Sequence, residues 1–118
     1  MTPTVFKIRV TQYYLSQYPA QSIPPSINQV MAYMTLRGEP AAVTFYIQFY
    51  LDGTQGLSAP SIEEVSGGVK VVVDMYYRQL ASIQASLNSA ICEKGPPCFM
   101  SLVSEPLHAE FFVSVPSA

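Results

Sequence analysis

The clearest candidates for chemistry in this sequence are a histidine and a glutamate that lie two residues apart. His108 and Glu110 stand in the stretch LHAEF, and residues two apart on a strand point to the same face. A carboxylate can raise the pKa of an imidazole and orient it for general acid–base catalysis. His108 is the single histidine, so a serine nucleophile would need it as its base. We favour an ordinary polar pair on a strand surface and keep both residues as weak candidates for catalysis.

The two cysteines, Cys92 and Cys98, raise three further kinds of chemistry: a metal site, a redox site and a disulfide. Structural zinc takes four Cys or His ligands, and His108 is the single other donor of this kind, so we expect no metal site. The five residues between the cysteines differ from the two of a redox C-x-x-C motif. Two reduced thiols and a disulfide that closes a short loop both stay open, and a reducing compartment favours the thiols.

Motifs that bind cofactors are missing from the sequence. It has neither the glycine-rich loops of nucleotide-binding folds, nor the H-E-x-x-H of zinc hydrolases, nor the G-x-S-x-G of α/β-hydrolases. We therefore predict no cofactor and favour a protein that is not an enzyme.

Tyrosine forms the other distinctive group, with eight in the chain and no tryptophan. A tyrosine ring offers a large contact area and a hydroxyl, and tyrosine is enriched at protein interfaces. The sequence pattern places four of them on the outer faces of their elements: Tyr13, Tyr46, Tyr50 and Tyr77. We predict these four as interface residues, with packing into the core as the alternative.

The content of charged residues is low, at 12% of the chain against a usual ~25%, while hydrophobic residues make up 49%. Since a soluble monomer usually exposes many charges, we expect copies of the chain or another protein subunit to cover part of the surface. A surface of neutral Ser, Gln, Thr and Asn is the alternative. The net charge of −2 and the lack of a basic cluster argue against nucleic-acid binding.

The length of 118 residues suggests a single globular domain over 1–118. The apolar runs are far shorter than the ~20 residues of a membrane-spanning helix. The first residues lack the basic and apolar regions of a signal peptide. We therefore expect a soluble, cytoplasmic protein with no membrane span, which includes a virus or phage component made in a host cytoplasm.

Four segments are predicted to form strands, and in residues 4–15 and 41–51 the prediction rests on alternating apolar and polar residues. They cover residues 4–15, 41–51, 98–104 and 107–115. The stretch AAVTFYIQFYL at 41–51 shows the pattern most clearly, because apolar residues occupy every position on one face. These strands would position the His108–Glu110 pair and three of the four predicted interface tyrosines, namely Tyr13, Tyr46 and Tyr50.

Two other segments support both a helix and a strand. Over residues 61–91, apolar residues recur every three or four positions, which predicts one long helix. Within it, VKVVVDMYY at 69–77 also alternates, so a strand there is the alternative. Residues 27–37 follow a possible N-cap, Ser26, and precede Gly38, which favours a short helix over a strand.

Together these elements predict an α+β fold, in which a mainly antiparallel sheet of about four strands packs against the long helix at 61–91, with a short helix at 27–37. An all-β sandwich is the alternative. For function, we expect a non-enzymatic assembly or interaction subunit that associates with itself. A domain that binds a small apolar ligand between helix and sheet is the second hypothesis. A small enzyme using His108 and Glu110 is the third.

Overall fold

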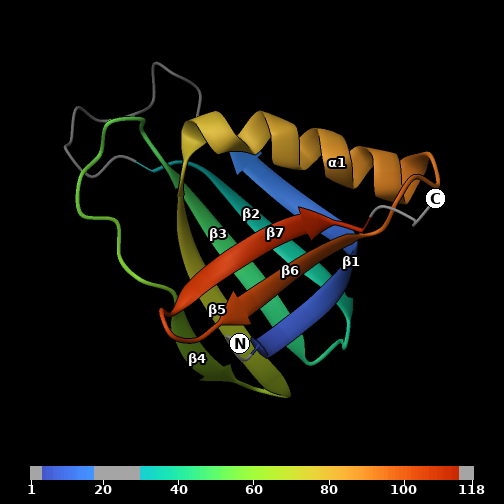
Figure 1. Ribbon diagram of the computed structural model, residues 1–118, viewed down its shortest axis with the longest axis horizontal. Coiled ribbons are helices and arrows are strands. Elements are labelled where there is room, and N and C mark those ends of the chain that lie inside the picture. The colour runs from blue at the N-terminus through green and yellow to red at the C-terminus, as the bar shows by residue number, and fades with distance from the viewer. Residues whose placement is uncertain (1–3, 18–29, 115–118) are drawn as a thin grey trace.

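The computed structural model describes residues 4–17 and 30–114, which form a curled seven-stranded sheet and one α-helix (Figure 1). The elements are β1 (Thr4–Gln17), β2 (Val30–Glu39), β3 (Val43–Tyr50), β4 (Ser61–Val65), β5 (Gly68–Tyr76), a 3₁₀ turn (Tyr77–Gln79), α1 (Leu80–Cys92), β6 (Cys98–Val103) and β7 (His108–Val113). Across the sheet the order is β4-β5-β3-β2-β1-β6-β7. All neighbouring strands are antiparallel except β3 and β5, which are parallel.

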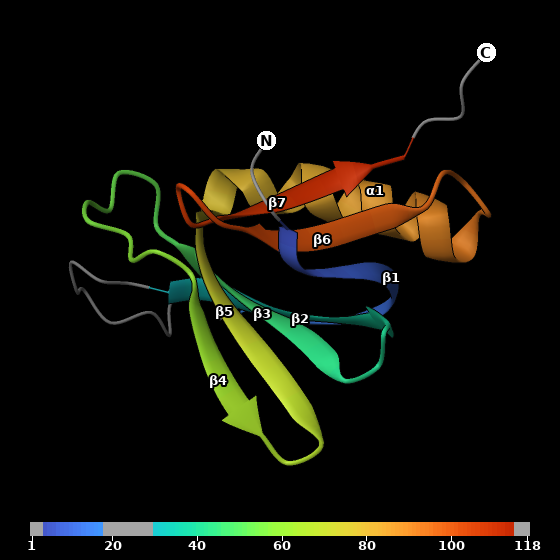
Figure 2. The same cartoon turned by 60° about the horizontal axis from the view of Figure 1, so that its bottom comes forward.

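Alternating apolar residues turn one face of this sheet into the core. In β3, Val43, Phe45, Ile47 and Phe49 are buried, whereas the residues between them are half-buried. The neighbouring strands β2 and β5 follow the same period of two. Because the sheet curls into a half-barrel, the buried side chains of its strands meet on the concave side (Figure 2).

The helix α1 packs against the concave side of the half-barrel. Its apolar stripe consists of Leu80, Ile83 and Leu87, and all three side chains are buried. No side-chain hydrogen bond caps its first turn, so burial of this stripe contributes most to holding the helix in place. In the described part of the chain, no helix has the length and apolar character needed to cross a membrane.

A β-bulge in β1 changes which of its residues face the core. The pairing with β2 shifts between Val10 and Gln12, so the alternation moves by one residue beyond this point. Val10, before the bulge, is buried. After the bulge, Tyr13 packs against the core, whereas Tyr14 is 61% exposed.

The strand β5 lies between β3 and β4, although β4 precedes it in the chain. The loop of residues 51–60 therefore passes over the end of β5 on its way from β3 to β4. Among the hydrogen bonds that hold this loop in place, two join it to the end of β5 and to the 3₁₀ turn that follows. The hydroxyl of Tyr76 donates to the carbonyl oxygen of Thr54 at 2.9 Å, and the backbone N–H of Arg78 donates to the carboxylate of Asp52 at 3.0 Å.

The predicted long helix at 61–91 is wrong over most of its length, and so is the α+β fold with four strands. Residues 61–65 and 68–76 form a hairpin, and the α-helix spans only Leu80–Cys92. Gly67 has a φ of +84°, which lets the chain turn at a point where glycine would cost a helix ~1 kcal/mol. The valines of β5 favour a pleated strand. The alternative strand at 69–77 was the correct interpretation.

The predicted short helix at 27–37 is also wrong where the structure describes it. Residues 30–39 form β2, the strand between β1 and β3, and residues 27–29 lie outside the described residues. The helix preference of Met and Ala is outweighed here by burial, because every second residue of β2 points into the core.

The four predicted strands are confirmed in type and position. β1, β3, β6 and β7 match the segments at 4–15, 41–51, 98–104 and 107–115 to within two residues at each end, and residue 115 lies outside the described residues. Alternation identified β1 and β3 because each has one face in the core, whereas β6 is buried on both faces.

Candidate functional site

The structure brings the predicted pair His108 and Glu110 together at the start of β7. Nε2 of His108 lies 2.8 Å from a carboxylate oxygen of Glu110, and Nδ1 lies 2.7 Å from the carbonyl oxygen of Pro106. Both neighbours are hydrogen-bond acceptors, so the ring satisfies them together only as an imidazolium that donates from both nitrogens. The Pro106 carbonyl, followed by the Glu110 carboxylate, accordingly raises the pKa of His108 above its usual value.

This arrangement favours a structural role for the histidine over a catalytic one. An imidazolium has no lone pair with which to accept a proton, and a general base needs one. Both ring nitrogens are engaged by acceptors that belong to β7 and the turn before it. The side chain of His108 thus ties the turn at residues 104–107 to the first residues of β7.

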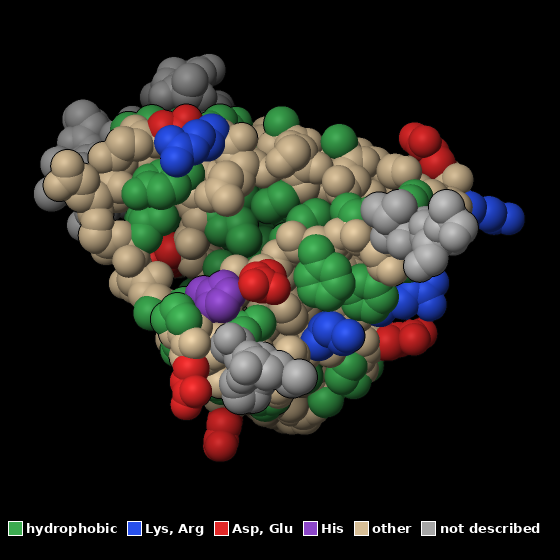
Figure 3. Space-filling view, viewed as in Figure 1, with side chains coloured by type: hydrophobic (Ala, Val, Ile, Leu, Met, Phe, Trp, Pro, Cys, Tyr) green, Lys and Arg blue, Asp and Glu red, His purple; other side chains and the backbone are tan. Residues whose placement is uncertain are grey.

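A groove of about 550 Å³ runs between α1 and β7, beside this pair. Met75 and Ile83 contribute apolar side chains from β5 and α1, and Ala109 and Phe111 contribute them from β7. Glu110 stands at the border of the groove as its charged group. Figure 3 shows the hollow between α1 and β7, with apolar side chains inside it. Its volume lies within the ~300–1,000 Å³ typical of ligand pockets.

The outer, convex face of the sheet carries two stacked aromatic pairs, each beside a lysine. Tyr33 and Tyr46 stack with ring centres 5.5 Å apart, and Lys70 lies 4.5 Å from the centre of the Tyr46 ring. Phe99 and Phe112 stack with ring centres 5.3 Å apart. A lysine amino group close to an aromatic ring is attracted by its electron-rich face. These contacts fix the rings on the surface in defined positions.

Two of the four predicted interface tyrosines, Tyr46 and Tyr50, lie on this outer face as expected. Both are half-buried residues of β3 that alternate with its core residues. The hydroxyl of Tyr50 donates to the side-chain oxygen of Gln48 at 3.4 Å. Burial, and then the charge of Asp74, raises the pKa of Tyr50. Their role at an interface stays a prediction.

The other two predicted interface tyrosines lie elsewhere. Tyr13 follows the bulge in β1, so it turns to the inner side, and its hydroxyl donates to the side-chain oxygen of Asn88 on α1. Tyr77 lies in the 3₁₀ turn before α1 and is 36% exposed. The residue that takes the outward position in β1 is Tyr14, and a single-residue bulge leaves no clear mark in the sequence.

Both cysteines are free thiols in the structure. Cys92 is exposed at the end of α1, whereas Cys98 is buried in β6. The thiol of Cys98 donates a hydrogen bond to the carbonyl oxygen of Ser86 at 3.3 Å, and burial raises its pKa. A raised pKa keeps the buried thiol protonated, so Cys98 acts as a small apolar side chain of the core.

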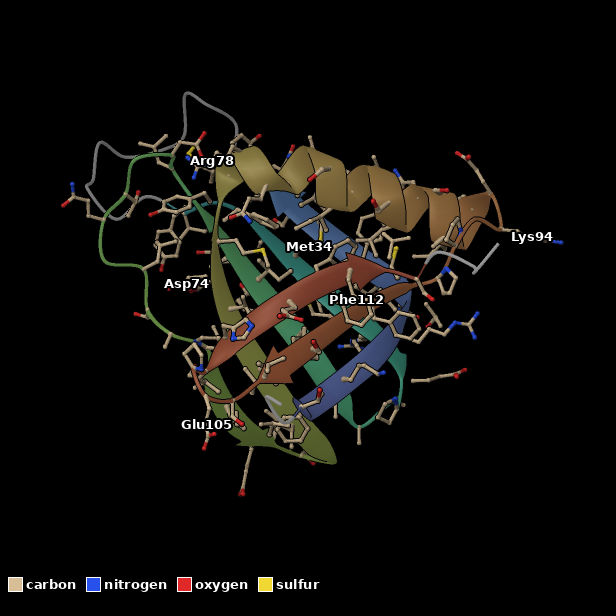
Figure 4. The ribbon with its side chains drawn as sticks, viewed as in Figure 1. Met34, Asp74, Arg78, Lys94, Glu105 and Phe112 are labelled. Carbon is tan, nitrogen blue, oxygen red and sulfur yellow. The ribbon has the colours of Figure 1, made fainter. Side chains whose placement is uncertain are left out.

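Sequence reasoning missed a small polar pocket of about 160 Å³ beneath the loop of residues 51–60. Asp74 of β5 lies in it, and its carboxylate accepts the backbone N–H of Ser58 at 3.2 Å. Burial raises the pKa of Asp74, although this hydrogen bond acts in the opposite direction. Arg78, four residues on, does not serve as its ion partner, because its guanidinium lies over the ring of Tyr76 at 4.8 Å (Figure 4). A lone aspartate within a valine-rich strand was the available signal.

Within residues 4–17 and 30–114, no three Cys, His, Asp or Glu side chains lie close enough together to hold a metal ion. No protein-family model, no curated protein and no solved structure matches this chain at a significant level.

Proposed function

We propose that this protein is a non-enzymatic assembly subunit that binds other copies of itself through the outer face of its sheet. The observation that supports this most is a row of neutral side chains across the middle of that face. Tyr14, Thr35, Tyr46 and Val72 are consecutive partners in the registers of β1, β2, β3 and β5. The helix α1 packs on the opposite, concave side, so it does not cover this row (Figure 2).

The surroundings of the row resemble the anatomy of a protein interface. Charged groups flank it in the next row, where Lys70 forms an ion pair with Glu63 at 3.9 Å. An apolar and aromatic centre within a charged rim is the usual arrangement at interfaces. The stack of Tyr33 on Tyr46 also fixes rings before a partner arrives, which reduces the entropy lost on binding.

Light scattering coupled to size-exclusion chromatography, over a series of protein concentrations, tests this proposal. We expect a molar mass that rises above that of the 13.0 kDa monomer. Tyr14→Lys places a charge in the centre of the row and should weaken association at least about tenfold. Ile91→Lys, a matched change at another exposed apolar residue, should leave it unaltered. A strict monomer at high concentration would contradict the proposal.

The groove between α1 and β7 supports a second candidate function, the binding of a small apolar ligand. Its volume and the apolar side chains of Met75, Ile83 and Phe111 support this candidate, and the polar side chains of Gln79 and Ser82 also line the groove. A fluorescent apolar probe such as anilinonaphthalene sulfonate should bind at the groove, and Ala109→Phe should reduce binding by filling it. Equal binding by the unchanged protein and this variant would contradict the second function.

A further inference from the structure

Within the residues that the structure describes, the strand β7 ends the sheet and pairs with β6 on one side only. Its other side faces the groove beside α1. An edge strand presents unpaired backbone N–H and C=O groups, which bind a further strand unless charges or bulges prevent it. The opposite edge, β4, carries two adjacent carboxylates, Glu63 and Glu64. β7 carries a single carboxylate, Glu110, which lies 2.8 Å from Nε2 of His108. β7 is therefore the less protected of the two edges.

One hydrogen bond shows which backbone groups of β7 point away from β6. The N–H of Ser114 donates to the carbonyl oxygen of Pro97 at 2.9 Å, so these two residues form a hydrogen-bonded pair. In an antiparallel ladder such pairs alternate with pairs that are not hydrogen-bonded. The backbone groups of Ala109, Phe111 and Val113 accordingly face the open side.

The side chains of these three residues point toward the inner side of the sheet. Ala109 and Phe111 line the groove, and Phe111 and Val113 pack against the core. Phe112 belongs to the opposite set and lies on the outer face (Figure 4). A strand added to β7 would thus hydrogen-bond at three positions and lay its inner side chains over Ile83 of α1. The surface thus offers unpaired backbone groups that can hydrogen-bond to an added strand, and apolar side chains on which that strand can pack.

We propose that a second copy of β7 occupies this edge, antiparallel about a two-fold axis at Phe111. The inference rests on the proposed self-association and adds a second contact between copies, separate from the outer face. In a two-fold antiparallel pair, one residue lies opposite its own copy and defines the register. Registers centred on Glu110 or on Phe111 pair five residues of β7 in each copy, whereas registers centred on the other residues of β7 pair fewer. Centring on Glu110 sets two carboxylates directly opposite each other, which destabilises a strand pair. Charge therefore selects the register centred on Phe111.

In this register Phe111 lies opposite Phe111 of the other copy, and Ala109 lies opposite Val113. Glu110 faces Phe112, so no like charges meet. Two-fold pairing closes the assembly at this contact, because the same patch is used on both copies. The sheet then continues from one copy to the next, and the two grooves meet at the axis.

Cysteine cross-linking in a Cys92→Ser background tests the register. Phe111→Cys places two thiols on a hydrogen-bonded pair with Cα atoms about 5.5 Å apart, within disulfide range, so mild oxidation should give a covalent dimer. Ala109→Cys should not link to itself, because its copies lie roughly 14 Å apart along the strands. A mixture of Ala109→Cys and Val113→Cys should link, which tests the register in a protein that keeps Phe111.

Ala109→Pro tests the same contact without a cysteine. It removes an N–H that faces the open side and takes no part in the ladder with β6, so the fold should persist, as circular dichroism would show. The dimer should dissociate about tenfold more readily than with Ala109→Ser.

Four outcomes would overturn this inference. Self-linking of Ala109→Cys without linking of Phe111→Cys would show another register. A link between Ile62→Cys and Phe111→Cys in a mixture would show that β4 of the second copy occupies the edge. Dimers seen by light scattering, when neither Phe111→Cys nor the mixture of Ala109→Cys and Val113→Cys gives a covalent link, would reject the β7 contact and leave the proposed self-association standing. A strict monomer would reject both.

Discussion

Replacing Gly68 with alanine should lower the free energy of unfolding if residues 61–76 form a hairpin and should raise it if they form a helix. In the structure, a Cβ at Gly68 would overlap the carbonyl oxygen of Ala42. The same oxygen accepts the N–H of Val69 at 2.8 Å, next to the first pair of the parallel ladder between β3 and β5. The steric overlap should cost ~1–3 kcal/mol and loss of the hydrogen bond ~1 kcal/mol. Alanine also lowers the conformational entropy of the unfolded chain, which offsets ~0.4–1 kcal/mol of this loss. Gly68→Ala should therefore lower the free energy of unfolding by about 2 kcal/mol.

Urea unfolding followed by circular dichroism measures this difference, with the m-value as a check on two-state behaviour. Ser66→Ala, at an exposed position in the same turn, is the matched control and should stay within about 0.5 kcal/mol of the unchanged protein. If the segment were a helix, Gly68→Ala would stabilise the protein by ~1 kcal/mol. A neutral or stabilising result would refute the hairpin and the parallel pair built on it.

Two further predictions concern single hydrogen bonds. The pKa of His108 is raised in the folded protein, by the Pro106 carbonyl first and by Glu110 second. The contribution of His108 to the free energy of unfolding is therefore complete below the ordinary pKa of 6.5, and it is lost as the pH rises through the higher pKa of the folded state. The free energy of unfolding should fall over this pH range, and His108→Gln should abolish the fall. An NMR titration of the single imidazole that gives an unraised pKa would contradict this prediction. Tyr13→Phe removes the hydrogen bond to Asn88 and should lower the free energy of unfolding by ~1 kcal/mol. If the losses caused by Tyr13→Phe and Asn88→Ala simply add up in the double mutant, the hydrogen bond contributes nothing.

The fold could be predicted from the sequence where one strand face is buried and the other is not. The stretch at 41–51 alternates without a break, and the structure places it as β3 in the centre of the sheet. Residues 61–91 could not be assigned in this way, because apolar spacing alone cannot separate a valine-rich strand followed by a helix from one long helix. The deciding interaction is the ladder between β5 and β3, whose residues are more than twenty positions apart in the chain.

The candidate site was predictable as far as it depends on neighbours in the chain. His108 and Glu110 share a strand, and their hydrogen bond follows from a spacing of two. The positions of the tyrosines depend on the bulge at Val10, which moves Tyr13 inward and Tyr14 outward. The groove and the free edge of β7 arise from how the sheet curls, and no local pattern encodes that.

The position of β5 between β3 and β4 makes β4 a protective strand. Among the described strands β4 pairs only with β5, and all five of its residues are exposed, so it can open locally while the rest of the ladder stays intact. When it opens, the valine-rich β5 becomes the edge of the sheet, and a segment of this composition is prone to aggregate with other chains. The two glutamates of β4 therefore protect a neighbouring strand whose two charges, on Lys70 and Asp74, cancel each other. Changes that weaken β4 should appear first as aggregation, before any loss of the core.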